Sequence, residues 1–143
     1  MRKLDSNLMH AALTALLEPD ETYQSPVYVS FSERHSSVLG QACGFLAVTT
    51  HQRLLVSKFN LLTIPLEQRA FALQDLQELS VRQIPLLKIR KLTMRFQEMG
   101  KMESLRCFCN AKVYGMGLHE QEQNLQQLLE TLNLWSARSD FTE

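Results

Sequence analysis

The sequence predicts an α+β protein that is mainly β, in which a small barrel of strands is closed by a helix. Three observations predict this fold. Residues 44–56 contain two apolar stretches of β-favouring residues around a polar turn at 50–52, which is typical of a β-hairpin. Further along, apolar and polar residues alternate as they do in half-buried strands. Near the end, the apolar residues instead recur every three or four positions, as on one face of a helix.

The chain begins with a predicted helix. Between residues 4 and 18 the apolar positions recur at helical spacing, and Pro19 ends the pattern. A helix of about 14 residues is only marginally stable alone in water, so we expect it to dock on the outer face of its own barrel or on a neighbouring subunit. The candidate residues for this contact, which would be an oligomer contact in the second case, are Leu8, Leu13 and Leu16.

Short strands are predicted on both sides of the hairpin. The first strand covers residues 28–31 and is followed by a polar loop at 33–37. Residues 60–66 form another short strand, in which Pro65 indicates a sheet edge or a strand end because proline has no backbone N–H to donate. Residues 71–83 are expected to form a turn and then a strand.

The clearest half-buried strand covers residues 87–97, and a turn at 98–101 leads from it into a partner strand at 103–109. The apolar face of the first of these strands holds Leu92, Met94 and Phe96. The apolar face of the second holds Leu105, Cys107 and Cys109. Both thiols are therefore interpreted as small hydrophobic side chains of the core.

The final helix is predicted within residues 117–136, and residues 139–143 are expected to form a frayed tail. The glutamine-rich stretch at 121–127 is assigned to the surface of this helix. The apolar face of the helix would consist of Leu118, Leu125, Leu128, Leu129, Leu132 and Trp135. The chain is thus divided into an N-terminal helix (1–20), a barrel with its capping helix (21–136) and a tail (137–143).

Composition excludes several classes of protein. The 143 residues fit one domain, and 15 basic residues balance 15 acidic ones, so no long-range attraction to nucleic acid is expected. No apolar run approaches the roughly 20 residues that cross a bilayer, and the N-terminus lacks the apolar segment of a signal peptide. The three cysteines are odd in number and include a C-x-C pair, which fits reduced thiols. We therefore expect a cytoplasmic protein.

The hairpin resembles a motif of the bacterial pleckstrin-homology (PH)-like domain family. In that family a Gly-x-Leu-x-Val-Thr-x-x-Arg-Leu-like pattern marks paired strands near the start of the barrel. The matching residues here are Gly44, Leu46, Val48, Thr49, Arg53 and Leu54. The resemblance covers about residues 20–135. It implies a seven-stranded, partly open barrel capped by the C-terminal helix, to which this chain adds an N-terminal helix, and a role in binding rather than catalysis.

The family resemblance also bears on the ligand. Relatives that bind phosphoinositides hold the headgroup with Lys and Arg residues on the first two strands and the loop between them. The corresponding loop of this chain, at 33–43, offers only Arg34, which is offset by Glu33. Recognition of phosphoinositides in that manner is therefore not expected.

A local excess of basic residues in the middle of the chain is the strongest candidate for a site that binds through charge. The candidate residues for binding an anion or a partner are Arg82, Lys88, Arg90, Lys91 and Arg95. No acidic residue lies between Glu78 and Glu98. On a strand, Lys91 and Arg95 share one face and Arg90 lies on the other, so the cluster is expected to be split.

Two binding interpretations remain open at this point. The first is a non-catalytic module that acts through protein–protein contacts, including self-association as a homo-oligomer, with no cofactor. The second is a peripheral membrane adaptor that binds anionic lipid through its basic strand face. Binding of nucleic acid is not expected, because exposed aromatic residues are not interleaved with the cations.

An enzyme is the third interpretation. It would depend on a thiolate among Cys43, Cys107 and Cys109 with a nearby histidine as base. The four histidines of the chain are His10, His35, His51 and His119. Nothing in the spacing of these residues pairs a thiol with a base, and none of the spacings matches a common zinc motif, so no catalytic residue and no metal site is assigned.

Overall fold

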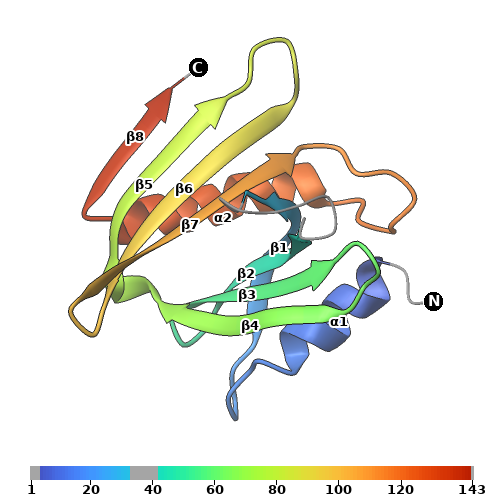
Figure 1. Ribbon diagram of the computed structural model, residues 1–143, viewed down its shortest axis with the longest axis horizontal. Helices are drawn as coiled ribbons and strands as arrows, with labels where there is room; N and C mark the ends of the chain where they lie inside the picture. Colours follow the sequence, from blue (N-terminus) through green and yellow to red (C-terminus); the bar gives the residue numbers. More distant parts are fainter. Residues whose placement is uncertain (1–3, 33–41, 143) are drawn as a thin grey trace.

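A computed structural model describes residues 4–32 and 42–142 of the chain. Within these residues the chain forms one eight-stranded sheet and two α-helices (Figure 1). The elements are α1 (Ser6–Thr14), β1 (Tyr23–Phe31), β2 (Ala42–Thr49), β3 (Arg53–Asn60), β4 (Pro65–Ala72), the 3₁₀ turn η2 (Leu73–Asp75), β5 (Leu76–Gln83), β6 (Ile89–Glu98), β7 (Lys101–Asn110), α2 (Gln121–Trp135) and β8 (Arg138–Thr142).

The strands of the described sheet lie in the order β4-β3-β2-β1-β7-β6-β5-β8. Neighbouring strands run antiparallel, except for β5 and β8, which run parallel. The predicted α+β, mainly β class is therefore confirmed. Among the described residues there are eight strands instead of the expected seven, and the sheet is open, because no ladder joins its edge strands β4 and β8.

The open sheet is nevertheless curled. Phe71 of β4 stacks on Phe96 of β6 with ring centroids 4.4 Å apart, although four strands lie between β4 and β6 in the sheet order. Arg69 of β4 also pairs with Glu98 at the end of β6 (2.9 Å) and with Glu103 of β7 (3.4 Å). Side-chain contacts therefore join β4 to β6 and β7 at this end of the sheet, although these strands are not paired by backbone hydrogen bonds.

The main core lies between the sheet and α2. Figure 1 shows α2 between the β1–β4 part of the sheet and the β5–β8 part. The helix buries Leu125, Leu128, Leu129 and Leu132 against the inner face of the sheet. The inner face of β6 is buried as its alternation predicts, with Leu92, Met94 and Phe96 fully covered. The change from strand period to helix period along the sequence thus corresponds to two real layers.

A second core lies on the other side of β2 and β3. Here α1 buries Leu8, Met9 and Leu13 against side chains that include Phe45 and Leu55. Both faces of β2 are therefore covered, by α2 and the inner core on one side and by α1 on the other. This explains why β2 is a nearly continuous apolar stretch instead of an alternating one.

Gly44 is required by a close approach between β2 and β3. A Cβ atom at this position would lie 1.9 Å from the backbone carbonyl oxygen of Ser57. Because the obstructing atom belongs to the backbone of the paired strand, no side-chain rotation relieves the clash. The first residue of the motif that resembles PH-like domains is thus a packing requirement of the hairpin.

Besides shifted strand ends, such as β1 beginning at Tyr23 instead of at residue 28, the structure differs from the predicted elements in three places. Residues 61–63 form a turn instead of a strand, because Asn60 Oδ1 accepts hydrogen bonds from the N–H groups of Leu62 (2.9 Å) and Ile64 (3.0 Å). The strand begins only at Pro65, at a sheet edge as expected. The final helix begins at Gln121, so Leu118 precedes it.

The third difference is at the C-terminus. Residues 138–142 form β8, which pairs with β5, instead of a frayed tail. All five side chains of β8 are exposed, so the strand buries no apolar residue that the sequence could reveal. Trp135 at the end of α2 is also partly exposed, at 40%. The predicted loop at 33–37 lies outside the described residues.

Candidate functional site

The outer face of β5, β6 and β7 is the candidate site. Helix α2 covers the inner face of the sheet, and α1 covers the outer face of β2 and β3. Strand alternation turns Leu92, Met94 and Phe96 inward and the intervening residues of β6 outward. The outward side chains of these three strands are those opposite the core, and neither described helix packs on them.

Basic side chains gather on this outer face. Arg82 of β5 stands opposite Lys91 of β6 in the strand register, and Lys91 stands opposite Phe108 of β7. The Lys91 ammonium nitrogen lies 5.9 Å from the centre of the Phe108 ring. One row further along, Arg106 of β7 is exposed opposite Thr93. We call Arg82, Lys91, Arg95 and Arg106 the outer cationic face.

Arg95 differs from the other members of this face, because it has an acidic partner. Its guanidinium lies 3.5 Å from Glu78, and Glu78 also receives Arg138 of β8 at 3.7 Å. Arg106 and Arg138 were missed by the sequence analysis. They lie far along the chain from Arg82, and only the pairing of β7 and β8 into the sheet brings them near it.

Arg90 and Lys88 lie away from the outer face, so the predicted split of the basic cluster is present. Arg90 Nε donates to Gln83 Oε1 at 3.2 Å. Both cations line a hollow of about 180 Å³ together with Glu122 of α2. Arg90 also borders a second hollow of about 190 Å³, beside Phe141 of β8.

The linker between α1 and β1 carries a buried charge, Glu21. Arg53 Nε donates to Glu21 Oε2 at 2.9 Å, and the other end of the Arg53 guanidinium contacts Glu21 Oε1. The Thr49 hydroxyl and the backbone N–H of Glu18 donate to the same carboxylate. Hydrogen bonding by Arg53 is the main reason that the pKa of Glu21 falls from 4.5 to about 2, with the Thr49 and Glu18 contacts acting in the same direction.

These contacts give a structural meaning to the Thr and Arg of the hairpin motif. Thr49 ends β2 and Arg53 begins β3, so the two residues flank the tight turn and hold Glu21 between them. Arg53 also donates to the Leu16 carbonyl at 2.9 Å. The motif therefore ties α1 and its linker to the hairpin.

Glu18, Glu21 and His51 place ligand atoms within 4.8 Å of one another, which is close enough to surround a metal ion. Both oxygens of Glu21 are already hydrogen-bonded, mainly to Arg53. A guanidinium in direct contact with the carboxylate is a competing cation. The cluster is therefore satisfied as it stands, and we assign it a structural role.

Gln121 is buried, although the sequence analysis placed the glutamine-rich stretch on the surface. Its Oε1 accepts from the Tyr28 N–H (2.9 Å), and its Nε2 donates to the carbonyls of Tyr28 (2.8 Å) and Asn110 (3.0 Å). In the described ladder, β1 and β7 pair only at Ser30 and Phe31. The Gln121 amide thus satisfies backbone groups where these two strands separate.

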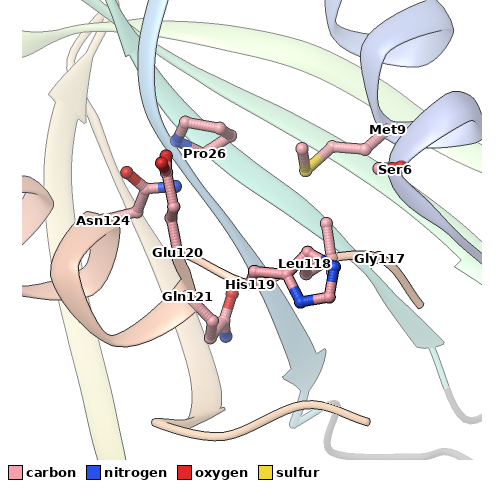
Figure 2. A pocket seen from close by; sticks show the side chains of 9 residues that line it. All are labelled: Ser6, Met9, Pro26, Gly117, Leu118, His119, Glu120, Gln121 and Asn124. Atoms are coloured by element: carbon pink, nitrogen blue, oxygen red, sulfur yellow. The ribbon is translucent and has the colours of Figure 1, made fainter. Parts of the chain in front are cut away.

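A hollow of about 250 Å³ lies where α1, β1 and the start of α2 meet. Figure 2 shows Ser6 and Met9 on one side of it, Glu120 and Asn124 on the other, and His119 between them. His119 and Glu120 are exposed, and Gln121 is occupied by backbone groups. Among the described residues that line this hollow, there is no group of buried charged side chains that could serve catalysis.

The cysteines are unsuited to thiolate chemistry. All three are buried, and desolvation raises the pKa of Cys43 and Cys107 and raises that of Cys109 to about 12. The placement of Cys107 and Cys109 in the core beside Leu105 confirms their predicted packing role. His10 contacts the Tyr23 hydroxyl, and His35 lies outside the described residues.

The residues proposed for an oligomer contact pack mainly against their own chain. Leu13 is fully buried and Leu8 nearly so, both against the outer face of β2 and β3. Leu16 is partly buried and lines an apolar groove of about 380 Å³ with Phe59 and Pro65. Of the two docking positions expected for this helix, the structure has the one on its own sheet.

No family model and no curated protein matches this chain. Among solved structures, it is similar to the hSac2 domain from human phosphoinositide phosphatase Sac2. The TM-score is 0.63 and the sequence identity 14%, over 96% of this chain and 87% of that one. At this identity the likeness shows a shared fold and nothing about the ligand. Within the described residues, neither helix is long and apolar enough to cross a membrane.

Proposed function

We propose that this protein is a non-catalytic binding module, with a PH-like fold, that docks on an acidic protein surface through its outer cationic face. The single observation that carries the proposal is the row of Arg82 and Lys91. These two cations stand directly opposite each other on neighbouring strands. Like charges in this arrangement destabilise a sheet, so an acidic partner would relieve a repulsion present in the free protein.

The neighbours of this pair strengthen the argument. Its row continues through Thr142 on one side and through Phe108 and Ser30 on the other, and none of these residues is acidic. A face with two adjacent cations and a partly exposed aromatic ring fits a protein surface, since Arg and aromatic residues are the common anchors of such contacts.

The PH-like part of the proposal rests on the order and packing of the elements. A β-hairpin near the start, a curled sheet and a C-terminal helix that covers its inner face are what the resemblance implies. The stack of Phe71 on Phe96 and the Arg69 ion pairs support a partly open barrel. The eighth strand and the N-terminal helix are additions to that plan.

A charge-reversal experiment tests the proposed contact. The intact chain and an Arg82→Glu/Lys91→Glu variant are used as bait in native extracts, beside a Lys101→Glu/Lys112→Glu control that changes the net charge equally away from the outer face. We expect one partner to be lost with the first variant, kept with the control and weakened by salt. Light scattering on the isolated chain shows whether that partner is a second copy. Retention of every partner by the first variant would refute the proposal.

A further inference from the structure

The β5–β6 turn ends in two leucines that lie in water. Leu86 is fully exposed, at 105%, and Leu87 is half exposed, at 53%. The Leu87 N–H donates to the Ile84 carbonyl (3.3 Å), and the Ile84 N–H donates to the Ile89 carbonyl (2.9 Å). Gln83 Nε2 also donates to the Leu87 carbonyl (2.7 Å). The two leucines are therefore presented by a turn of defined shape.

Leu86 occupies a backbone position that favours glycine. Pro85 is the second residue of the turn and Leu86 is the third, with a φ of 65°, which follows the pattern of a type II turn. The third residue of such a turn is normally Gly or Asn, and a leucine there strains the backbone. Since its side chain covers nothing in the fold, folding stability gives no reason for an apolar residue at this position.

Cations surround the base of the turn. Lys88 follows the leucines directly, Arg90 and Lys91 lie at the start of β6, and Arg82 stands opposite Lys91. Glu122 of α2 faces Lys88 and Arg90 across the hollow they share. Among the described residues that border this turn, the positive charges outnumber the negative ones. An apolar tip with a positively charged base is the result.

We propose that the β5–β6 turn docks on an anionic lipid surface. Leu86 and Leu87 enter the boundary between head groups and acyl chains, and the cations at the base contact acidic head groups. A lipid surface fits these observations better than a protein does, because the leucines protrude from a tip and positive charge surrounds them. The lipid contact shares Arg82 and Lys91 with the protein contact proposed above, and the leucines distinguish the two, since neither leucine belongs to the outer cationic face.

The test measures co-sedimentation of the full chain with vesicles of phosphatidylserine and phosphatidylcholine in equal amounts. Leu86→Asn is compared with Met99→Asn, because Met99 is equally exposed, at 97%, also has a positive φ, and lies at the opposite end of β6. We expect L86N to weaken binding about tenfold, or roughly 1.4 kcal/mol of lost apolar burial. Lys88→Gln should weaken it about fivefold, and M99N should bind as the wild type does.

A second measurement reports insertion directly. The Trp135→Phe substitution removes the single tryptophan of the chain, so that a new tryptophan can be observed alone. In this background, the fluorescence of a tryptophan introduced by Leu86→Trp should shift to shorter wavelength when these vesicles are added, and that of one introduced by Met99→Trp should not. Asn tolerates a positive φ, so L86N is expected to unfold at the same temperature as the wild type or higher, and weaker binding by a folded L86N supports the proposal. Lys101→Gln is the charge control for Lys88→Gln, because Lys101 lies at the opposite end of β6 beside the turn that holds Met99, and it should leave vesicle binding unchanged.

Several results would overturn the proposal. These are equal binding by L86N and the wild type, equal binding to vesicles of phosphatidylcholine alone, or no sedimentation of the wild type at low salt. Loss of binding in K88Q with full binding in L86N would show a purely electrostatic contact with the head groups and would equally refute insertion.

Discussion

Replacing Glu21 with Gln removes the buried negative charge that holds α1 to the β2–β3 hairpin. The Arg53 guanidinium then keeps only the Leu16 carbonyl and Glu18, whose side chain is 55% exposed and 3.2 Å away. The fall of the Glu21 pKa from 4.5 to about 2 corresponds to roughly 3 kcal/mol of stability at neutral pH. We therefore expect Glu21→Gln to lower the free energy of unfolding by about that amount, or the midpoint of thermal unfolding by about 10 °C.

The pH dependence of this difference has a defined sign. Because the pKa of Glu21 is lower in the folded protein, its contribution is complete above the unfolded value of 4.5 and is lost as the pH falls toward 2. The gap in stability between wild type and Glu21→Gln should therefore narrow on acidification. By pH 3, roughly 2 of the 3 kcal/mol should be gone.

Urea unfolding followed by circular dichroism, at several values between pH 7 and pH 3, measures both effects. Glu18→Gln is the matched control, because Glu18 also pairs with Arg53 but is half exposed, and its loss should cost less than about 1 kcal/mol. If the two variants lose equally little at pH 7, or if the Glu21→Gln gap stays constant down to pH 3, the reasoning about this cluster is wrong.

Three other substitutions test the packing. Gly44→Ala places a Cβ against the Ser57 carbonyl and should cost at least about 2 kcal/mol in urea unfolding. Gln121→Leu leaves backbone groups of β1 and β7 without hydrogen-bond partners and should lower the free energy of unfolding by about 3 kcal/mol. The control Gln123→Leu, on the exposed side of α2, should change it by less than about 0.5 kcal/mol. Equal losses in the two variants would contradict the bridging role of Gln121. Leu13→Ala opens the core beneath α1 and should lower the thermal midpoint through a loss of about 3 kcal/mol, and a loss below about 1 kcal/mol would contradict this packing.

Periodicity predicted most of the buried residues in elements that have one buried face and one face exposed to solvent. The strand alternation of Leu92, Met94 and Phe96 and the helical spacing of the leucines in α2 both correspond to buried faces. The same rule located Cys107 and Cys109 in the core. It did not locate β8, because a strand whose side chains are all exposed has no apolar pattern and is held by backbone pairing with β5.

Polar side chains were harder to place than apolar ones. Gln121 and Gln123 are the same residue type two positions apart, yet one bridges separated strands and the other is exposed. Glu21 and Arg53 are 32 residues apart, and their pairing follows from where the linker after α1 crosses the hairpin turn. Such partners are chosen by geometry, since a hydrogen bond requires a particular distance and direction and leaves no repeat in the chain.

The sequence by itself determined the mainly β class, the hairpin, the buried faces of β6 and β7, most of the buried face of α2 and the presence of a basic segment in the middle of the chain. These are local properties, set by which side chains avoid water. Only the tertiary structure decided that α1 packs on its own sheet, that a C-terminal strand completes the sheet, and that Arg82 and Lys91 share a row while Arg90 does not reach it. Those facts depend on how distant segments pair, and pairing is fixed by the registers of the whole sheet together.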